Sequence, residues 1–253
     1  MKPEKNKLYE GDCLEIMRQW DDACIDHCIT DPPYNMSKKN GLGWAFSSHV
    51  TMSEEWDIYP REEYLAFCRA WIEEVCRVVR PNGNLFVFGS FHNIYDLGHI
   101  MHDLGLKILN SIVWFKPNAQ PNITCRMLTE STEHIIWACN APKDEATGWV
   151  FNYEVAKDLN GGKQMRNMWS CPYPSKTERR HGRHPSQKPI DVLTRIMLIA
   201  TNPDELILDC FGGSGTTGVV AQSFDRNWVM IESNPEYSEI ARSRLEQGRV
   251  PRP

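Results

Sequence analysis

The sequence lacks any long apolar run, and its first seven residues are polar or charged apart from Met1 and Pro3. A membrane-spanning helix needs about 20 consecutive apolar residues, and a secretory signal needs an apolar stretch near the N-terminus. Neither pattern is present. We therefore expect a protein that is neither membrane-bound nor exported and that works in the cytoplasm.

The nine cysteines include no C-x-x-C pair, so the spacing typical of a zinc site or a redox-active dithiol is missing. Disulfide scaffolds are small secreted domains, whereas this chain has 253 residues and no secretory signal. We expect reduced thiols and predict no metal site.

The chain also lacks an overall excess of positive charge. Its formal net charge of −5 argues against a protein that coats nucleic acid, because phosphate binding requires Lys and Arg. The basic residues are concentrated locally, however: seven Lys or Arg and only one acid lie between residues 163 and 188. Such a segment suits either a solvated loop or a nucleic-acid contact.

The length suits one α/β domain, and no internal repeat is visible. Apolar periodicity predicts helices and strands that alternate along the chain. The expected helices are 61–79, 92–104, 191–200, 216–223 and 235–245, and the expected strands are 25–30, 84–88, 106–115, 132–138, 205–210 and 227–231. The strands 106–115 and 132–138 are expected to form an adjacent or antiparallel pair. Residues 35–60 show neither period and are predicted to form a long loop.

The strand predicted at 25–30 ends at Asp31-Pro32-Pro33-Tyr34, where two prolines stop regular structure. Ligands of doubly wound sheets bind outside the carboxyl ends of the strands. An aromatic amine is a poor nucleophile because its lone pair is delocalised into the ring. The Asp31 carboxylate and the Pro32 carbonyl can accept hydrogen bonds from the two N–H groups of such an amine, which localises the lone pair on nitrogen. Tyr34 offers a flat surface on which a flipped base can stack. Alone, the motif would equally suit a simple turn.

A second motif, residues 206–218, combines an apolar strand, a glycine-rich turn and a helix start. Such a turn lets the backbone approach a ligand and presents free amides. Gly213-x-Gly215-x-x-Gly218 matches the dinucleotide fingerprint, and Glu232 follows at the distance expected for a ribose-binding carboxylate. An NAD-dependent oxidoreductase is therefore one interpretation.

Three features count against a nucleotide phosphate at this turn. Only 35 residues follow Gly218, too few for the second half of a dinucleotide-binding fold. Asp209 directly precedes the turn and would disfavour a pyrophosphate, and no Lys follows the glycines as in a Walker loop. S-adenosylmethionine, with one ribose, a cationic sulfonium and ammonium and no phosphate, suits Asp209 and Glu232 better.

Taken together, the motifs resemble the β group of DNA amino-methyltransferases, in which D-P-P-Y precedes F-x-G-x-G, and the resemblance covers essentially the whole chain. The matching blocks are Tyr9–Cys13, Ile29–Asn35, Gly162–Met165, His184–Pro189, Asp209–Thr217 and Ile231–Glu232. The resemblance implies a Rossmann-like S-adenosylmethionine-dependent methyltransferase fold with a circularly permuted motif order. Its sheet is mostly parallel and seven-stranded, with one antiparallel strand, helices on both faces and inserted target-recognition loops. We expect a single methyltransferase domain over 1–253, with 140–183 as the inserted target-recognition segment.

The resemblance also implies residue roles. Asp31, Pro32, Pro33 and Tyr34 carry the chemistry. Cofactor contacts are implied at the adenine by Asp12 and Cys13, at the ribose by Glu232, at the methionine end by Asp209, Phe211, Gly213, Ser214, Gly215, Thr216 and Thr217, and over the pocket by Ser186 and Lys188. Cys210 and Ser186 stand where the family commonly has Pro and Thr, and both are small enough to keep the pocket.

The activity implied is methyl transfer to adenine N6 in a short DNA sequence, by base flipping. Residues 89–95, 121–126 and 162–166 are similar to DpnA-type adenine methyltransferases, which act at GATC. Basic residues of two insertions, within residues 116–126 and 163–183, are predicted to contact DNA: Lys116, Arg126, Lys163, Arg166, Lys176, Arg179, Arg180 and Arg183. The partners implied are double-stranded DNA, with single-stranded DNA as a further substrate, a second copy of the chain in a homodimer, and a cognate restriction enzyme.

Other functions share some of these features. A cytosine-N4 methyltransferase needs the same amine chemistry, although by family habit Asp31 favours adenine. A protein glutamine methyltransferase uses a related N-P-P-Y motif, but there the glycine loop comes first. A catalytically silent DNA-binding module would not need the acids Asp12, Asp31, Asp209 and Glu232.

Overall fold

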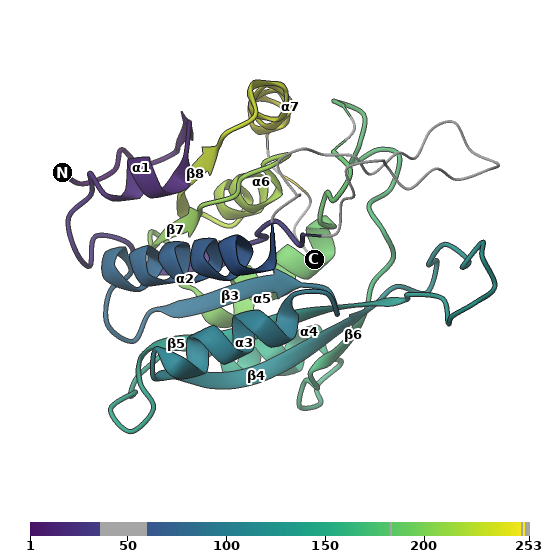
Figure 1. Cartoon of the computed structure of the whole chain (residues 1–253), viewed down its shortest axis with the longest axis horizontal. Helices are drawn as coiled ribbons and strands as arrows, with labels where there is room; N and C mark the ends of the chain where they lie inside the picture. Colours follow the sequence, from purple (N-terminus) through teal and green to yellow (C-terminus); the bar gives the residue numbers. More distant parts are fainter. Residues whose placement is uncertain (36–59, 183, 249, 251–253) are drawn as a thin grey trace.

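The computed structural model consists of one twisted sheet with helices on both of its faces (Figure 1). It describes residues 1–35, 60–182, 184–248 and 250, so the predicted loop 35–60 lies almost wholly outside the described residues. In this described part the strands are β1 (Lys7–Glu10), β2 (His27–Thr30), β3 (Asn84–Gly89), β4 (Leu106–Phe115), β5 (Thr132–Pro142), β6 (Met168–Ser170), β7 (Leu206–Asp209) and β8 (Asn227–Glu232). Their order across the sheet is β1-β8-β7-β2-β3-β5-β4-β6.

Neighbouring strands run parallel except at β5, which pairs antiparallel with β3 and β4. The predicted fold class is confirmed, including its one antiparallel strand. The expected count of seven strands is corrected to eight among the described residues, because β6 adds an edge strand beside β4. This strand lies within 140–183 and has only three residues, of which Trp169 alone is buried. It is too short to produce a visible alternation.

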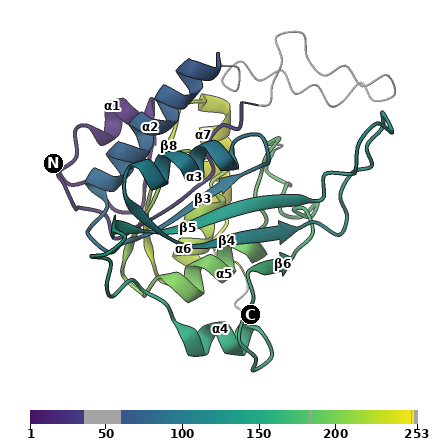
Figure 2. The ribbon, with the colours of Figure 1, turned by 60° about the horizontal axis from the view of Figure 1, so that its bottom comes forward.

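Helices cover the two faces in separate groups, as Figure 2 shows. The helices of the described residues are α1 (Cys13–Met17), α2 (Arg61–Val78), α3 (Ile94–Asp103), α4 (Tyr153–Leu159), α5 (Ile190–Ala200), α6 (Thr216–Ser223) and α7 (Pro235–Glu246). Helices α1, α2 and α3 contribute to the core on one face, and α4, α5 and α6 to the core on the other. No helix in the described ranges combines the length and apolar character needed to cross a membrane.

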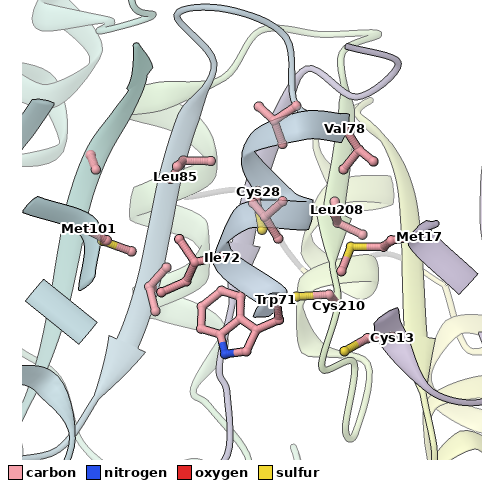
Figure 3. Packing of buried hydrophobic residues seen from close by; sticks show 14 of the residues in the cluster. Cys13, Met17, Cys28, Trp71, Ile72, Val78, Leu85, Met101, Leu208 and Cys210 are labelled. Carbon is pink, nitrogen blue, oxygen red and sulfur yellow. The ribbon is translucent and has the colours of Figure 1, made fainter. Parts of the chain in front are cut away.

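Successive residues of the central strands enter opposite hydrophobic layers. Cys28 and Leu85 face the layer that includes α2, whereas Ile29 and Phe86 face the layer that includes α5. Figure 3 shows Trp71 of α2 among the buried residues of the first layer. Side chains alternate along a strand, and both faces of this sheet are covered, so the central strands are mostly apolar, with buried polar residues at their ends such as His27, Thr30 and Asn84.

The glycine turn packs closely against α7. Gly215 has a φ of 77°, and a Cβ at this position would lie 2.9 Å from the Cβ of Ala241. We expect Gly215→Ala to lower the free energy of unfolding by about 2–4 kcal/mol, because a strained φ and overpacking each contribute. Urea unfolding measures this loss.

Gly161→Ala is the matched control, since Gly161 has a φ of 65° and no atom would lie within 4 Å of its Cβ. This variant retains only the cost of the φ angle, about 1–2 kcal/mol. Equal losses in the two variants would contradict a packing role for Gly215.

Candidate active site

Four carboxylates mark the carboxyl ends of four adjacent parallel strands. Asp12 follows β1, Glu232 ends β8, Asp209 ends β7 and Asp31 follows β2. All four line one cavity of about 180 Å³. Because parallel strands end at the same edge of the sheet, residues that are far apart in the sequence meet there.

The cavity collects nearly all of the predicted catalytic and cofactor-binding residues. All four residues of the D-P-P-Y motif and every predicted cofactor residue except Gly215 line it. Gly215 instead packs behind the turn, against Ala241. Sequence reasoning assigned no site role to several other residues of the lining: Thr30, Phe67, Phe88, His184, Leu193, Asn234 and Tyr237. His184 is the first residue of a block that resembles the family, so the sequence could have identified it. Phe67 lies on α2, outside those blocks, and no sequence motif marks it.

Glu232 holds the glycine turn through the backbone. Its carboxylate accepts hydrogen bonds from the Gly213 amide at 2.7 Å and from the Asn234 amide at 2.8 Å. Burial raises the pKa of Glu232, and these backbone donors oppose the rise. The carboxylate is therefore fixed in position at the cavity wall.

Asp209 connects the glycine turn to the D-P-P-Y corner. It accepts hydrogen bonds from the hydroxyls of Thr217 at 2.6 Å and Thr30 at 2.8 Å, and Thr30 directly precedes Asp31. Burial raises the pKa of Asp209 to about 7, although its hydrogen-bond donors oppose the rise. The two motifs are thus held in fixed relative positions.

The charges of the cavity wall favour a cationic ligand. Burial, with help from Lys188 and Arg244, lowers the pKa of His184 to about 3, so this ring is neutral at physiological pH. Among the described lining residues, Lys188 is then the one cationic side chain beside four acids, and it pairs with Asp31. This arrangement of carboxylates suits a cationic ligand that carries ribose hydroxyls, such as S-adenosylmethionine, and does not suit a pyrophosphate.

The D-P-P-Y corner is held by hydrogen bonds from three directions. The Tyr34 hydroxyl donates to Asp31 Oδ1 at 2.7 Å, and Lys188 Nζ donates to Asp31 Oδ2 at 2.5 Å. The Tyr64 hydroxyl donates to the Pro33 carbonyl at 2.8 Å. Burial raises the pKa of Asp31, and Lys188 opposes that rise. The corner therefore presents a partly buried, oriented carboxylate to the cavity.

Two residues next to this corner, Lys116 and Glu133, have positions that the sequence did not predict. Lys116 was predicted to contact DNA, but its side chain is only 4% exposed, pairs with Glu133 at 3.2 Å and lies over the rings of Trp114 and Tyr173. A phosphate contact by Lys116 is therefore not supported. Glu133 had no predicted role, since a single acid at the start of a strand carries no signal in the sequence.

The other residues predicted to contact DNA lie outside the cavity lining. Arg126, Lys163, Arg166, Lys176 and Arg180 are exposed, and Arg179 is partly buried. Arg183 lies outside the described residues.

Comparison with known proteins agrees with a cavity that suits S-adenosylmethionine. A protein family described as DNA methylase matches residues 25–243. The chain belongs to this DNA methylase family. The family predicted from the sequence motifs is thereby confirmed.

Relatives of this methylase match over nearly their full length. The type II methyltransferase M2.DpnII of Streptococcus pneumoniae is 40% identical over 251 residues, which cover 97% of this chain and 92% of the relative. The type II methyltransferase M2.MboI of Moraxella bovis is 38% identical over 249 residues, with coverage of 96% and 89%.

Two solved structures resemble the methylase. The M1.HpyAVI–SAM complex has a TM-score of 0.69 and 28% identity, covering 94% of this chain and 98% of that chain. The cytosine-N4-specific PvuII DNA methyltransferase has a TM-score of 0.74 and 20% identity, covering 96% and 87%. The second likeness concerns the fold alone.

Proposed function

We propose that this methylase transfers a methyl group from S-adenosylmethionine to N6 of an adenine flipped out of double-stranded DNA, within the sequence GATC. One observation carries the proposal: the acidic pocket and the Asp31 corner line the same cavity. A cofactor in the pocket would therefore be next to an amine held by Asp31. Asp31 favours adenine by the resemblance described above, and the similarity to DpnA-type enzymes favours GATC.

Different pocket residues are assigned to different parts of S-adenosylmethionine. Asp12 and Cys13 are assigned to the adenine, Glu232 to the ribose hydroxyls, and Asp209 with the glycine turn to the methionine end. A carboxylate is the natural acceptor for ribose hydroxyls and the natural neighbour of a cation. When bound, S-adenosylmethionine supplies the activated methyl group, as its chemistry requires.

The Asp31 corner prepares the nucleophile. The Asp31 carboxylate and the Pro32 carbonyl accept hydrogen bonds from the two N–H groups of the target amine, which concentrates its lone pair on nitrogen. Tyr34 offers its ring as a stacking surface for the flipped base. After transfer the nitrogen carries one proton more than the neutral product, and Asp31, whose pKa is raised by burial, is the adjacent acceptor.

DNA recognition is assigned to the two insertions. The connection between β4 and β5, residues 116–131, extends beyond the sheet in both ribbon views and carries the exposed Arg126 (Figures 1 and 2). The segment 140–183 also carries exposed basic side chains: Lys163, Arg166, Lys176 and Arg180. Such side chains suit phosphate and base-edge contacts on a protein of net negative charge. A homodimer, single-stranded substrates, a cognate restriction enzyme and a cytoplasmic location stay predictions.

Nucleoside analysis of methylated DNA tests the proposal. The purified protein is incubated with methyl-labelled S-adenosylmethionine and unmethylated genomic DNA, and the labelled positions are mapped. We expect N6-methyladenine at GATC, and no label on a matched oligonucleotide in which GATC is changed to GTAC. N4-methylcytosine would support the cytosine alternative instead. Cofactor binding without any label on DNA would overturn the proposal.

A further inference from the structure

A cluster of four alternating charges joins Asp31 and Lys188 of the cavity lining to two residues outside that lining, Glu133 and Lys116. Lys188 Nζ lies 2.5 Å from Asp31 Oδ2 and 3.4 Å from Glu133 Oε2, and Lys116 Nζ lies 3.2 Å from Glu133 Oε1. The four side chains are between 4% and 17% exposed. They form a charge cluster that we name by its members, Asp31, Lys188, Glu133 and Lys116.

The fold brings these residues together at the same edge of the sheet. Asp31 follows β2, Lys116 follows the parallel-running β4, and Glu133 lies near the start of the antiparallel β5. The Lys116 amide also donates to the Ser131 carbonyl at 2.7 Å, which fixes the base of the β4–β5 connection. Two positive and two negative charges leave the cluster neutral, as burial of ionised groups requires.

Asp31 and Glu133 share the same two donors. The Tyr34 hydroxyl lies 2.7 Å from Asp31 Oδ1 and 3.1 Å from Glu133 Oε2, and Lys188 lies between the same two carboxylates. A donor that moves towards Glu133 leaves an oxygen of Asp31 more available to an incoming N–H group. Lys116 binds the other oxygen of Glu133 and so moderates its attraction for the shared donors.

We propose that Glu133 and Lys116 are a positioning pair, which sets how Lys188 and Tyr34 are shared with Asp31 and thereby how strongly Asp31 accepts a hydrogen bond from the target amine. This inference rests on the proposed function. Neither residue of the pair touches the reacting atoms, so each acts through the donors it shares or neutralises. The ionisation of Asp31 is the measurable consequence, because an exchange of charge at Glu133 or Lys116 changes the field at its carboxylate.

Protonation of the cluster follows from its contacts. Burial would raise the pKa of Glu133, but Lys188 and Lys116 outweigh it and hold the pKa below its usual value. Burial opposes the charge of Lys188 as well, yet Asp31 and Glu133 raise its pKa. The groups that face Asp31 from the elements packed around it are Tyr34, Glu133, Lys188 and Asp209. Lys116 faces Glu133 and is one contact further from Asp31.

The test measures kcat/KM for DNA against pH at saturating S-adenosylmethionine. Asp31 must be ionised to accept the amine, so its protonation defines the acid limb of the profile. Glu133→Gln removes a negative neighbour, which lowers the pKa of Asp31 and moves the acid limb about 1 unit to lower pH. Lys116→Met removes a positive charge, which moves the limb about 1 unit to higher pH.

The double variant Glu133→Gln/Lys116→Met restores a neutral cluster, and we expect its acid limb to return towards that of the unmodified enzyme. Glu133→Asp keeps the charge and should also keep the limb near its original position. Glu130→Gln is the matched control, because Glu130 is exposed in the same connection. Thermal unfolding and cofactor affinity establish that each variant is folded.

Shifts of opposite sign in the two single variants, with recovery in the double variant, would support the positioning pair. A structural role alone would lower activity in both variants without opposite shifts of the limb, and that result would overturn the inference. If the inference fails in this way but the unmodified enzyme methylates DNA, the proposed function is unaffected. An unmodified enzyme that methylates no DNA would overturn both.

Discussion

Asp31→Ala is expected to lower the single-turnover rate of methylation by about 10³-fold, because the target amine loses the acceptor that concentrates its lone pair. Affinity for S-adenosylmethionine should stay within about threefold, since the cofactor contacts are assigned to other strand ends and each lost charged contact would cost more than this. Rapid-quench assays with labelled cofactor measure the rate, and calorimetric titration measures the affinity.

The matched control is Asp144→Ala, because Asp144 is exposed and lies outside the cavity lining. Asp31→Asn adds a second comparison, as it keeps the size of the side chain and one oxygen acceptor but removes the charge that pairs with Lys188 at 2.5 Å. We expect a rate between those of the unmodified enzyme and Asp31→Ala. Full activity in Asp31→Ala would exclude the role assigned to this carboxylate.

Glu232→Gln should have its largest effect on cofactor affinity. The substitution removes a charged acceptor assigned to the ribose hydroxyls, and it turns an amide group towards one of the backbone donors, Gly213 or Asn234. Hydrogen bonds to charged groups contribute about 1.5–3 kcal/mol each, so we expect the dissociation constant of S-adenosylmethionine to rise about 10- to 100-fold. Calorimetric titration measures the rise directly.

Raising the cofactor concentration should recover most of the methylation rate of Glu232→Gln, in contrast to Asp31→Ala. Glu239→Gln is the matched control, since Glu239 is exposed on α7 nearby and lines no part of the cavity. An unchanged dissociation constant in Glu232→Gln would show that this carboxylate does not bind the ribose.

Much of the fold followed from periodicity, because the central strands and the long helices carry strong patterns. The predicted strand at 84–88 corresponds to β3 (Asn84–Gly89), and the predicted helix at 61–79 corresponds to α2 (Arg61–Val78). Four elements of the described residues were not predicted: β1 with four residues, β6 with three, α1 with five and α4 with seven. Each is too short for its pattern to stand out from the polar segments around it.

The sequence by itself determined the family, the fold class and most of the residues that line the cavity. Periodicity predicted the alternating α/β pattern, and local chemistry marked the two motifs, because prolines end a strand, glycines form a turn and acids follow apolar strands. The family and most of the residue roles followed from the resemblance of these motifs to known amino-methyltransferases. The order of these separated motifs along the chain made the family recognisable without coordinates.

Only the tertiary structure decided the partners of Lys116 and Glu133. Lys116 lies in a basic insertion and was read as a phosphate contact, yet the pairing of β4 with the antiparallel β5 turns it inwards to Glu133. The position of Lys188 between Asp31 and Glu133 likewise depends on segments more than 50 residues apart. Burial and long-range pairing decide whether a charge faces solvent or another charge, and neither can be read from the residues around it.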